Sequence, residues 1–170
     1  MRPPSSSTVS LFDVKVYSVI YFSFTLSSKD MPQWHLWNDS FYTFVDTTEM
    51  TWEDAANACS SMKEGAHLVF IESELENKEV SRLSKVASEG QNNRWWIGLT
   101  DIETEGVWKW YNVSLNYANW YQRQPDNGRN GEDCAELGYR WSGDNIAFWN
   151  DYQCTEKKKF ICESGFGKDL

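Results

Sequence analysis

A chain of 170 residues is long enough for one domain with a short extension, but short for two independent cores. Its composition of 41% hydrophobic and 24% charged residues predicts a packed core and excludes global disorder. The formal net charge of −9 argues against nucleic-acid binding, because phosphates require Lys and Arg, and against insertion or docking of the domain at anionic membranes. The charge is compatible with a cation site made of carboxylates, although solubility alone would also explain it.

The N-terminal segment differs in character from the rest of the chain. Val16–Leu26 is an apolar run of eleven residues, which is too short to span a bilayer as a helix. It follows Arg2 and Lys15 and precedes small residues, as in a signal peptide. We therefore predict that residues 1–33 are a signal-like or disordered leader and that residues 34–170 form the domain.

Strand and helix patterns alternate at the start of the domain. Phe41–Val45 is rich in β-forming residues and predicts a strand. Thr51, followed three residues later by Asp54, predicts a helix N-cap, and this helix is expected to end at Gly65. His67–Ile71 predicts a short buried strand.

A second helix is predicted to begin at Ser73, with Glu76 completing a capping box, and to end near Gly90. Its amphipathic pattern is carried by Leu75, Glu79, Val80, Leu83 and Val86.

The second half is predicted to be rich in β-structure. The predicted strands are Trp95–Leu99, Trp108–Trp110, Cys134–Leu137 and Phe160–Cys162. Between them, Asn112–Asp133 is rich in Asn, Asp, Gln and Gly and has little periodicity. Because such long loops are usually functional or disordered, this segment is the first place to look for a site. The fold class expected from the whole pattern is α+β.

Four cysteines, Cys59, Cys134, Cys154 and Cys162, lack the C-x-x-C spacing of zinc and redox motifs. Their even number predicts two disulfides and an oxidising compartment, but spacing alone leaves three connectivities open. Sequons at Asn38 and Asn112 also indicate a secreted glycoprotein.

Oxygen-bearing side chains gather in and after the long loop. They are Gln124, Asp126, Glu132, Asn150 and Asp151. Calcium prefers six to eight oxygen ligands from carboxylates, amides and carbonyls, and two of these positions can be taken by neighbouring sugar hydroxyls. The pattern thus predicts a calcium–diol site. The alternative is a solvated acidic loop held by turn-forming residues.

Six short motifs occur in a defined order. They are Trp96-Ile97-Gly98-Leu99, Asn119-Trp120, Gln124-Pro125-Asp126, Gly131-Glu132-Asp133-Cys134, Trp149-Asn150-Asp151 and Phe160-Ile161-Cys162-Glu163. At these residues the sequence resembles the C-type lectin-like fold, from about Trp34 to Glu163. The resemblance implies two helices, two small antiparallel sheets and a long calcium-binding loop. It also implies the short form of the domain, with disulfides Cys59–Cys162 and Cys134–Cys154.

The resemblance implies a principal calcium ion that also binds the sugar. Its ligands would be Gln124, Asp126, Glu132, Asn150 and Asp151, with a cis peptide bond before Pro125. An accessory calcium would be held by Asp101, Glu105, Asn127 and Asp133, although Asp101 and Glu105 are also explained as ordinary loop acids.

The sugar class follows from the resemblance too. In this family Gln-Pro-Asp accompanies galactose-type ligands, so Gln124-Pro125-Asp126 implies galactose or N-acetylgalactosamine. The loop that follows lacks the tryptophan with which many galactose binders stack on the sugar. Trp141 is the candidate replacement, its alternative role being a packed loop anchor.

The predicted function is therefore calcium-dependent binding of galactose-type glycans by a secreted, extracellular protein. The alternative is a module of the same fold that binds a protein or another non-sugar ligand. No enzyme is expected, because neither His35 nor His67 lies near a nucleophile motif. The sequence contains no coiled coil or collagen-like repeat, so any homo-oligomer would form through the surfaces of the domain.

Overall fold

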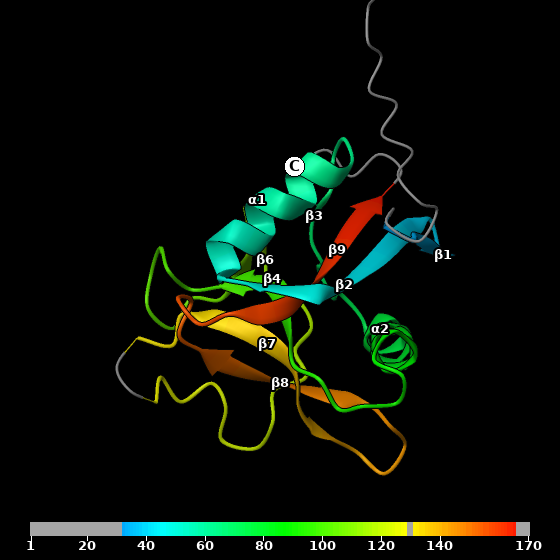
Figure 1. Ribbon diagram of the computed structural model, residues 1–170. Helices are drawn as coiled ribbons and strands as arrows, with labels where there is room; N and C mark the ends of the chain where they lie inside the picture. The colour runs from blue at the N-terminus through cyan, green and yellow to red at the C-terminus, as the bar shows by residue number, and fades with distance from the viewer. Residues whose placement is uncertain (1–31, 129–130, 166–170) are drawn as a thin grey trace, which may run out of the picture. The chain divides into compact units, whose positions relative to one another are not determined.

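The computed structural model describes residues 32–128 and 131–165, all of which belong to one compact unit, Met31–Leu170. The predicted leader, 1–33, lies almost entirely outside the described residues. Two helices and nine strands are present in this part of the chain (Figure 1). They are β1 (His35–Trp37), β2 (Ser40–Met50), α1 (Trp52–Met62), β3 (His67–Leu68), α2 (Glu74–Ala87), β4 (Trp95–Thr100), β5 (Lys109–Trp110), β6 (Val113–Ser114), β7 (Cys134–Trp141), β8 (Ala147–Tyr152) and β9 (Lys158–Gly165).

The strands form one connected sheet in the order β1-β2-β9-β4-β5-β6, with β7 and β8 branching from β4. All pairs of strands are antiparallel except β4 and β9, which are parallel and join the two halves of the sheet. The expectation of two separate antiparallel sheets is therefore corrected to one mixed sheet. The α+β class and the C-type lectin-like architecture are confirmed.

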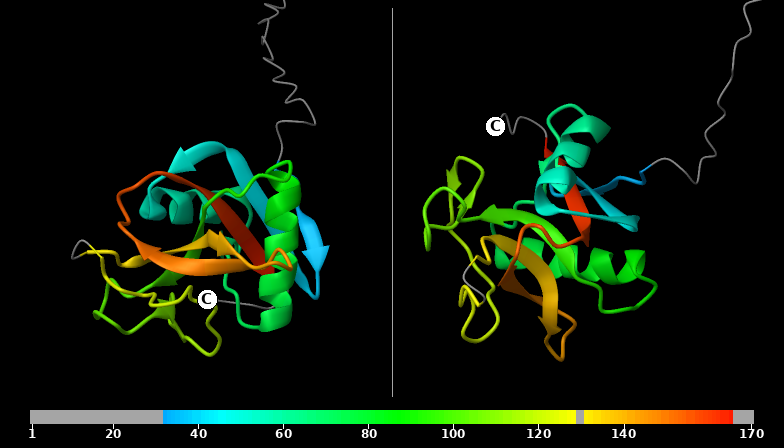
Figure 2. Two further views of the ribbon diagram at one scale, coloured as in Figure 1. Left: turned by 90° about the horizontal axis from the view of Figure 1, so that it is seen from below. Right: turned by 60° about the vertical axis from the view of Figure 1, so that its left-hand side comes forward.

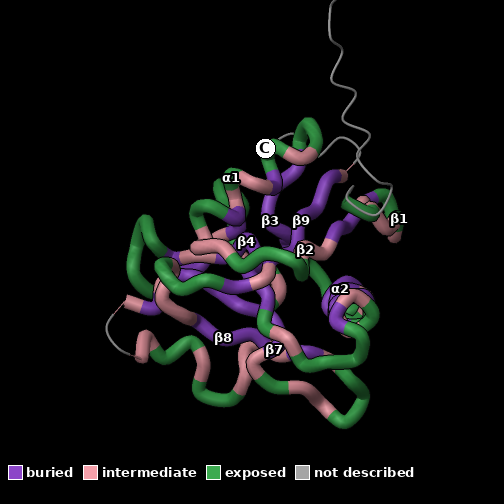
Figure 3. The backbone as a smooth tube through the Cα atoms, viewed as in Figure 1, coloured by how far each residue is buried: buried purple, intermediate pink, exposed green. Residues whose placement is uncertain are grey.

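Strand β4 is buried on both faces and separates two cores. Trp95, Ile97 and Leu99 point into the larger core, whereas Trp96 points into a smaller core beneath α1. This alternation follows from the two-residue period of a strand, and it explains why β4 is apolar without interruption. Figure 3 shows the buried strands at the centre and the exposed loops around them.

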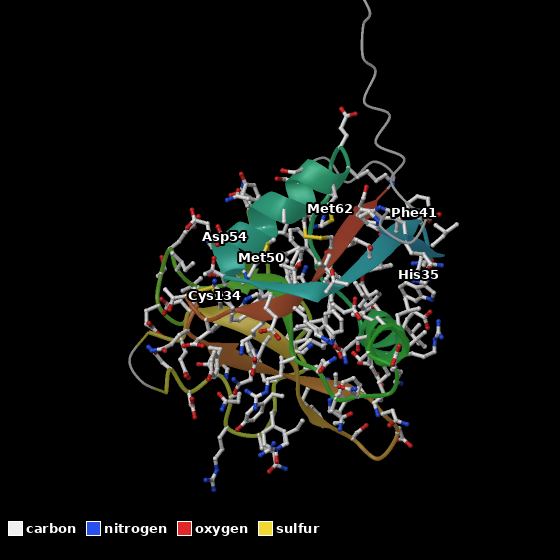
Figure 4. The ribbon with its side chains drawn as sticks, viewed as in Figure 1. His35, Phe41, Met50, Asp54, Met62 and Cys134 are labelled. Carbon is white, nitrogen blue, oxygen red and sulfur yellow. A yellow bond between two sulfur atoms is a disulfide. The ribbon has the colours of Figure 1, made fainter. Side chains whose placement is uncertain are left out.

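Helix α1 covers the smaller core. The hydroxyl of Thr51 accepts a hydrogen bond from the backbone N–H of Asp54, which confirms the predicted N-cap. Ala55 and Cys59 are buried, and Cys59 forms a disulfide with Cys162 on β9. The second disulfide is Cys134–Cys154, so both predicted pairs are confirmed. Figure 4 labels Cys134 at the start of β7, at the end of the sheet covered by the first turn of α1.

Helix α2 begins with Ser73 as its N-cap, as predicted, and Val80 and Leu83 are buried as expected, but the rest of its buried face differs from the prediction. Leu75 and Val86 are 69% and 62% exposed, whereas Asn77 and Ser81 are fully buried. Figure 2 shows α2 apart from α1, and it packs against β2 and β8. Residues of β8 supply the hydrogen-bond partners for this buried polar face. Asn77 accepts from the indole N–H of Trp149 and donates to the carbonyl of Ala147.

Three short strands were not predicted from sequence, namely β1, β6 and β8. The predicted strand His67–Ile71 is shorter, since only His67–Leu68 pairs with β9. Neither helix in the described part of the chain is long and apolar enough to cross a membrane.

Candidate cation site

Three carboxylates converge where the long loop meets the sheet. Ligand oxygens of Asp126, Glu132 and Asp151 all lie within 4.8 Å of one another. Asp126 and Glu132 come from the loop between β6 and β7, and Asp151 comes from β8. Because Asp151 pairs with Ala135 across the β7–β8 ladder, β8 brings its carboxylate beside the end of the loop.

Backbone hydrogen bonds wrap the loop around Asp151. Its Oδ2 accepts from the backbone N–H groups of Asp126 at 3.0 Å and Asn127 at 2.6 Å. The side-chain oxygen of Asn127 in turn accepts from the N–H groups of Gly131 and Glu132. A Cβ at Gly128 would lie 2.9 Å from Oδ1 of Asp126 and 3.0 Å from Oε2 of Glu132. Glycine at this position therefore leaves room for both carboxylates.

Two oxygens in this site are buried without a hydrogen-bond partner in the described part of the chain, Oδ1 of Asp151 and Oε1 of Gln124. Burial raises the pKa of Asp151, and the nearby Asp126 carboxylate raises it further, despite the backbone hydrogen bonds that oppose both effects. A bound cation would satisfy the unpartnered oxygens and offset this repulsion. The donors are all oxygen, which fits a hard ion such as calcium. The peptide bond between Gln124 and Pro125 is cis, as predicted.

The orientation of the fifth predicted ligand, Asn150, depends on a buried ion pair. Its Nδ2 donates to Oε1 of Glu136 at 3.2 Å and to the carbonyl of Asp151. Both hydrogen bonds use Nδ2, so Oδ1 is the atom left to face an ion. Glu136 is completely buried, and its carboxylate lies 2.8 Å from Nζ of Lys158 and 3.2 Å from Nη1 of Arg94.

Glu136 is a residue of the site that was not predicted from sequence. The sequence pattern that could have identified it is a single acid inside the apolar strand Cys134–Leu137, because a charged residue on a buried strand requires a partner. The partner, Lys158, lies 22 residues further along the chain and is not visible as such from sequence.

Comparison with known proteins identifies the family. The model of the lectin C-type domain matches residues 48–164. The chain belongs to the C-type lectin family. A barnacle protein, lectin BRA-3 of Megabalanus rosa, is 32% identical over 150 residues, covering 85% of each chain. C-type lectin CRL of Crotalus ruber ruber is 37% identical over 121 residues, covering 68% of this chain and 84% of the relative.

Solved structures agree with this assignment. The carbohydrate-recognition domain of mouse scavenger receptor C-type lectin is 37% identical, with a TM-score of 0.67 over 79% of this chain and 96% of that one. C-type lectin CEL-I from Cucumaria echinata is 29% identical, with a TM-score of 0.68 over 76% and 93%.

The residues predicted to hold an accessory calcium ion in this C-type lectin come together only in part. Asp101 is buried, its Oδ1 lacks a partner in the described residues, and its backbone N–H donates to the carbonyl of Asp133. Burial raises the pKa of Asp101, and Glu105 and Asp133 raise it further. However, these acids are not part of the close group of three carboxylates, and the side-chain oxygen of Asn127 is occupied within the loop. The accessory site stays a prediction.

Trp141, the candidate stacking residue, lies away from the three carboxylates, and its stacking role stays a prediction. It pairs with Ala147, whereas the site lies at the other end of the same ladder, where Ala135 pairs with Asp151. Along β8 these two pairs are four residues apart, about 13 Å, because β7 carries a bulge between Leu137 and Trp141. Nζ of Lys85 lies 4.8 Å from the centre of the Trp141 ring, which packs against the larger core as a loop anchor.

We predict that Glu136→Gln raises the calcium Kd of this C-type lectin about tenfold, because residues that orient metal ligands typically contribute this much. The glutamine amide would no longer reliably accept from Asn150. Calorimetric titration with calcium measures each Kd. Glu103→Gln, at an exposed ion pair with Lys109, is the matched control. An unchanged Kd in E136Q would contradict the orienting role.

Proposed function

We propose that this C-type lectin binds glycans through a calcium ion held by Gln124, Asp126, Glu132, Asn150 and Asp151. The observation that carries the proposal is the meeting of three carboxylates with two buried, unpartnered oxygens at one place. An acidic loop that served only for solubility would have no reason to bury Asp151 or to leave its Oδ1 without a partner. Two disulfides and the names of the relatives, which are lectins, support an extracellular carbohydrate-binding role.

Calcium, when bound, supplies a hard cationic centre with more coordination positions than these side chains fill, so two neighbouring hydroxyls can complete its shell. The carboxylates Asp126 and Glu132 can accept hydrogen bonds from such hydroxyls, and the amide of Gln124 can donate to them. The order of amide and acid in Gln124-Pro125-Asp126 sets which side donates, and we propose galactose or N-acetylgalactosamine on this basis.

The test is retention of the full chain on galactose and mannose resins, first with calcium and then with EDTA. Retention on galactose that EDTA abolishes is the expected result. Elution on acidification is also expected, because protons compete with calcium for the carboxylates, and burial raises the pKa of one of them, Asp151. Binding to galactose that persists unchanged in EDTA would contradict the mechanism.

A non-sugar ligand is the other outcome of the same test. The structure of herring type II antifreeze protein shares this fold, with a TM-score of 0.64 and 30% identity, so the fold also occurs in a protein named for another role. Calcium binding by calorimetry without retention on either resin would favour this alternative.

A further inference from the structure

Three partly buried aromatic rings form a cluster beside the cation site. The ring of Tyr121 packs edge-on against Tyr139 at 5.5 Å and against Phe148 at 5.7 Å, centre to centre. None of the three rings is fully buried. We name this cluster, Tyr121, Tyr139 and Phe148, the aromatic platform. Such rings can pack on the apolar face of a sugar.

The aromatic platform borders two of the proposed calcium ligands. The backbone carbonyl of Tyr121 accepts from the N–H of Gln124 at 2.9 Å, within a turn that ends at the ligand. Phe148 precedes Asn150 by two residues on β8, so both side chains lie on one face of the strand, about 7 Å apart. A glycan bound at the ion therefore has its next sugar unit within reach of these rings.

Two exposed arginines lie over the platform. The guanidinium carbon of Arg94 lies 5.0 Å from the centre of the Tyr139 ring, and that of Arg140 lies 4.9 Å from the same ring and 6.0 Å from Tyr121. Arg94 shares its charge with Glu136. None of the ion pairs in the described part of the chain involves Arg140. Arg140 is therefore a positive charge without a carboxylate partner among the described residues, in a chain whose net charge is −9.

We propose that the aromatic platform and Arg140 form a second subsite, which binds an anionic group, such as a sulfate ester, carried by the glycan whose galactose is held at the ion. This proposal rests on the proposed function and narrows its substrate class from neutral to anionic glycans. A guanidinium offers planar paired donors that match the oxygens of a sulfate. The two rings fix the position of the Arg140 guanidinium, and no acid among the described residues forms an ion pair with it. The rings supply the contact with the sugar that carries the sulfate.

The test compares three disaccharides: N-acetyllactosamine, the same sugar with a 6-sulfate on its N-acetylglucosamine, and the same sugar with a 6-sulfate on its galactose. All three keep the 3- and 4-hydroxyls of galactose free. The full chain, with calcium, is expected to bind at least one sulfated form about fivefold more tightly than the neutral sugar, as for one partly exposed charge contact. Arg140→Gln should remove this preference, so that the sulfated and neutral sugars bind with equal affinity. Raising the salt concentration should reduce the preference in the wild type.

Arg82→Gln is the matched control, because Arg82 is an exposed arginine on α2 that pairs with Glu79. It should keep the full preference for sulfate. Calcium-dependent binding with equal affinity for all three sugars would overturn the second subsite and leave the proposed function intact. A preference that survives in R140Q would also overturn it. Sulfate-dependent binding that is lost in R140Q but persists in EDTA would support the anion subsite and overturn the calcium mechanism.

Discussion

Replacing Asp151 by asparagine is expected to lower the calcium affinity by about 100-fold, roughly 2.7 kcal/mol, and to abolish calcium-dependent sugar binding. Asp151 is the fully buried member of the carboxylate group, and its Oδ1 is unpartnered among the described residues. The fold should survive, because an asparagine oxygen can still accept from the N–H groups of Asp126 and Asn127. Calorimetric titration with calcium and retention on galactose resin measure the two losses.

The thermal stability of calcium-free D151N provides a second test of this prediction. The pKa of Asp151 is raised, so its charge costs stability above that pKa, and the cost disappears as the pH falls through it. At neutral pH the calcium-free D151N protein should therefore unfold at the same temperature as the wild type or higher, whereas its rise in Tm on adding calcium should vanish. Asp144→Asn, an exposed acid at the far end of the same strand pair, should change neither property. A calcium-induced rise in Tm retained by D151N would contradict the assigned ligand.

Removal of the Cys59–Cys162 disulfide is expected to have the largest effect on stability. The two residues are 103 positions apart, and cross-linking a loop of that length removes unfolded-state entropy equivalent to about 4–5 kcal/mol. Cys134 and Cys154 are only 20 positions apart, so the same model gives about 3 kcal/mol for that pair. Urea unfolding of the double variants C59A/C162A and C134A/C154A, with calcium present, measures both values.

The two disulfides should rank in the opposite order in their effect on calcium affinity. Cys134 follows Glu132 and Asp133 directly and pairs with Tyr152, the neighbour of Asp151, so its disulfide holds the strand ends that carry the ligands. The shorter cross-link should therefore matter more for calcium affinity, and the longer one more for unfolding. If C134A/C154A bound calcium like the wild type, the shorter disulfide would have no role in shaping the site.

Local features of the fold could be predicted because their causes are local. The caps at Thr51 and Ser73 depend on residues three positions away, and strand β4 is recognisable from its own unbroken apolar run. The polar part of the buried face of α2 could not be predicted in this way. Asn77 and Ser81 look like surface residues until β8, about 70 positions later, supplies Trp149 and Ala147 as hydrogen-bond partners.

The same distinction applies to the site. Asp126, Glu132 and Asp151 were found from motifs, and the fold brings them together. Glu136 was missed because its partners come from elsewhere in the chain, Arg94 from the segment before β4 and Lys158 from β9. The position of Trp141 at the far end of the β7–β8 ladder from the carboxylates could not be read from its short sequence distance to the loop.

The pairing of β2 with β9 has a consequence for how several copies of the domain can be joined to one scaffold. Ser40 lies opposite Gly165, so the first and last long strands of the domain meet at one end of the sheet, while the loop that carries Asp126 and Glu132 leaves the sheet at another (Figure 1). Copies joined to a common scaffold beyond either strand would thus keep their binding loops uncovered. Weak single sites arranged in this way gain avidity without any new contact, because each further binding event becomes intramolecular.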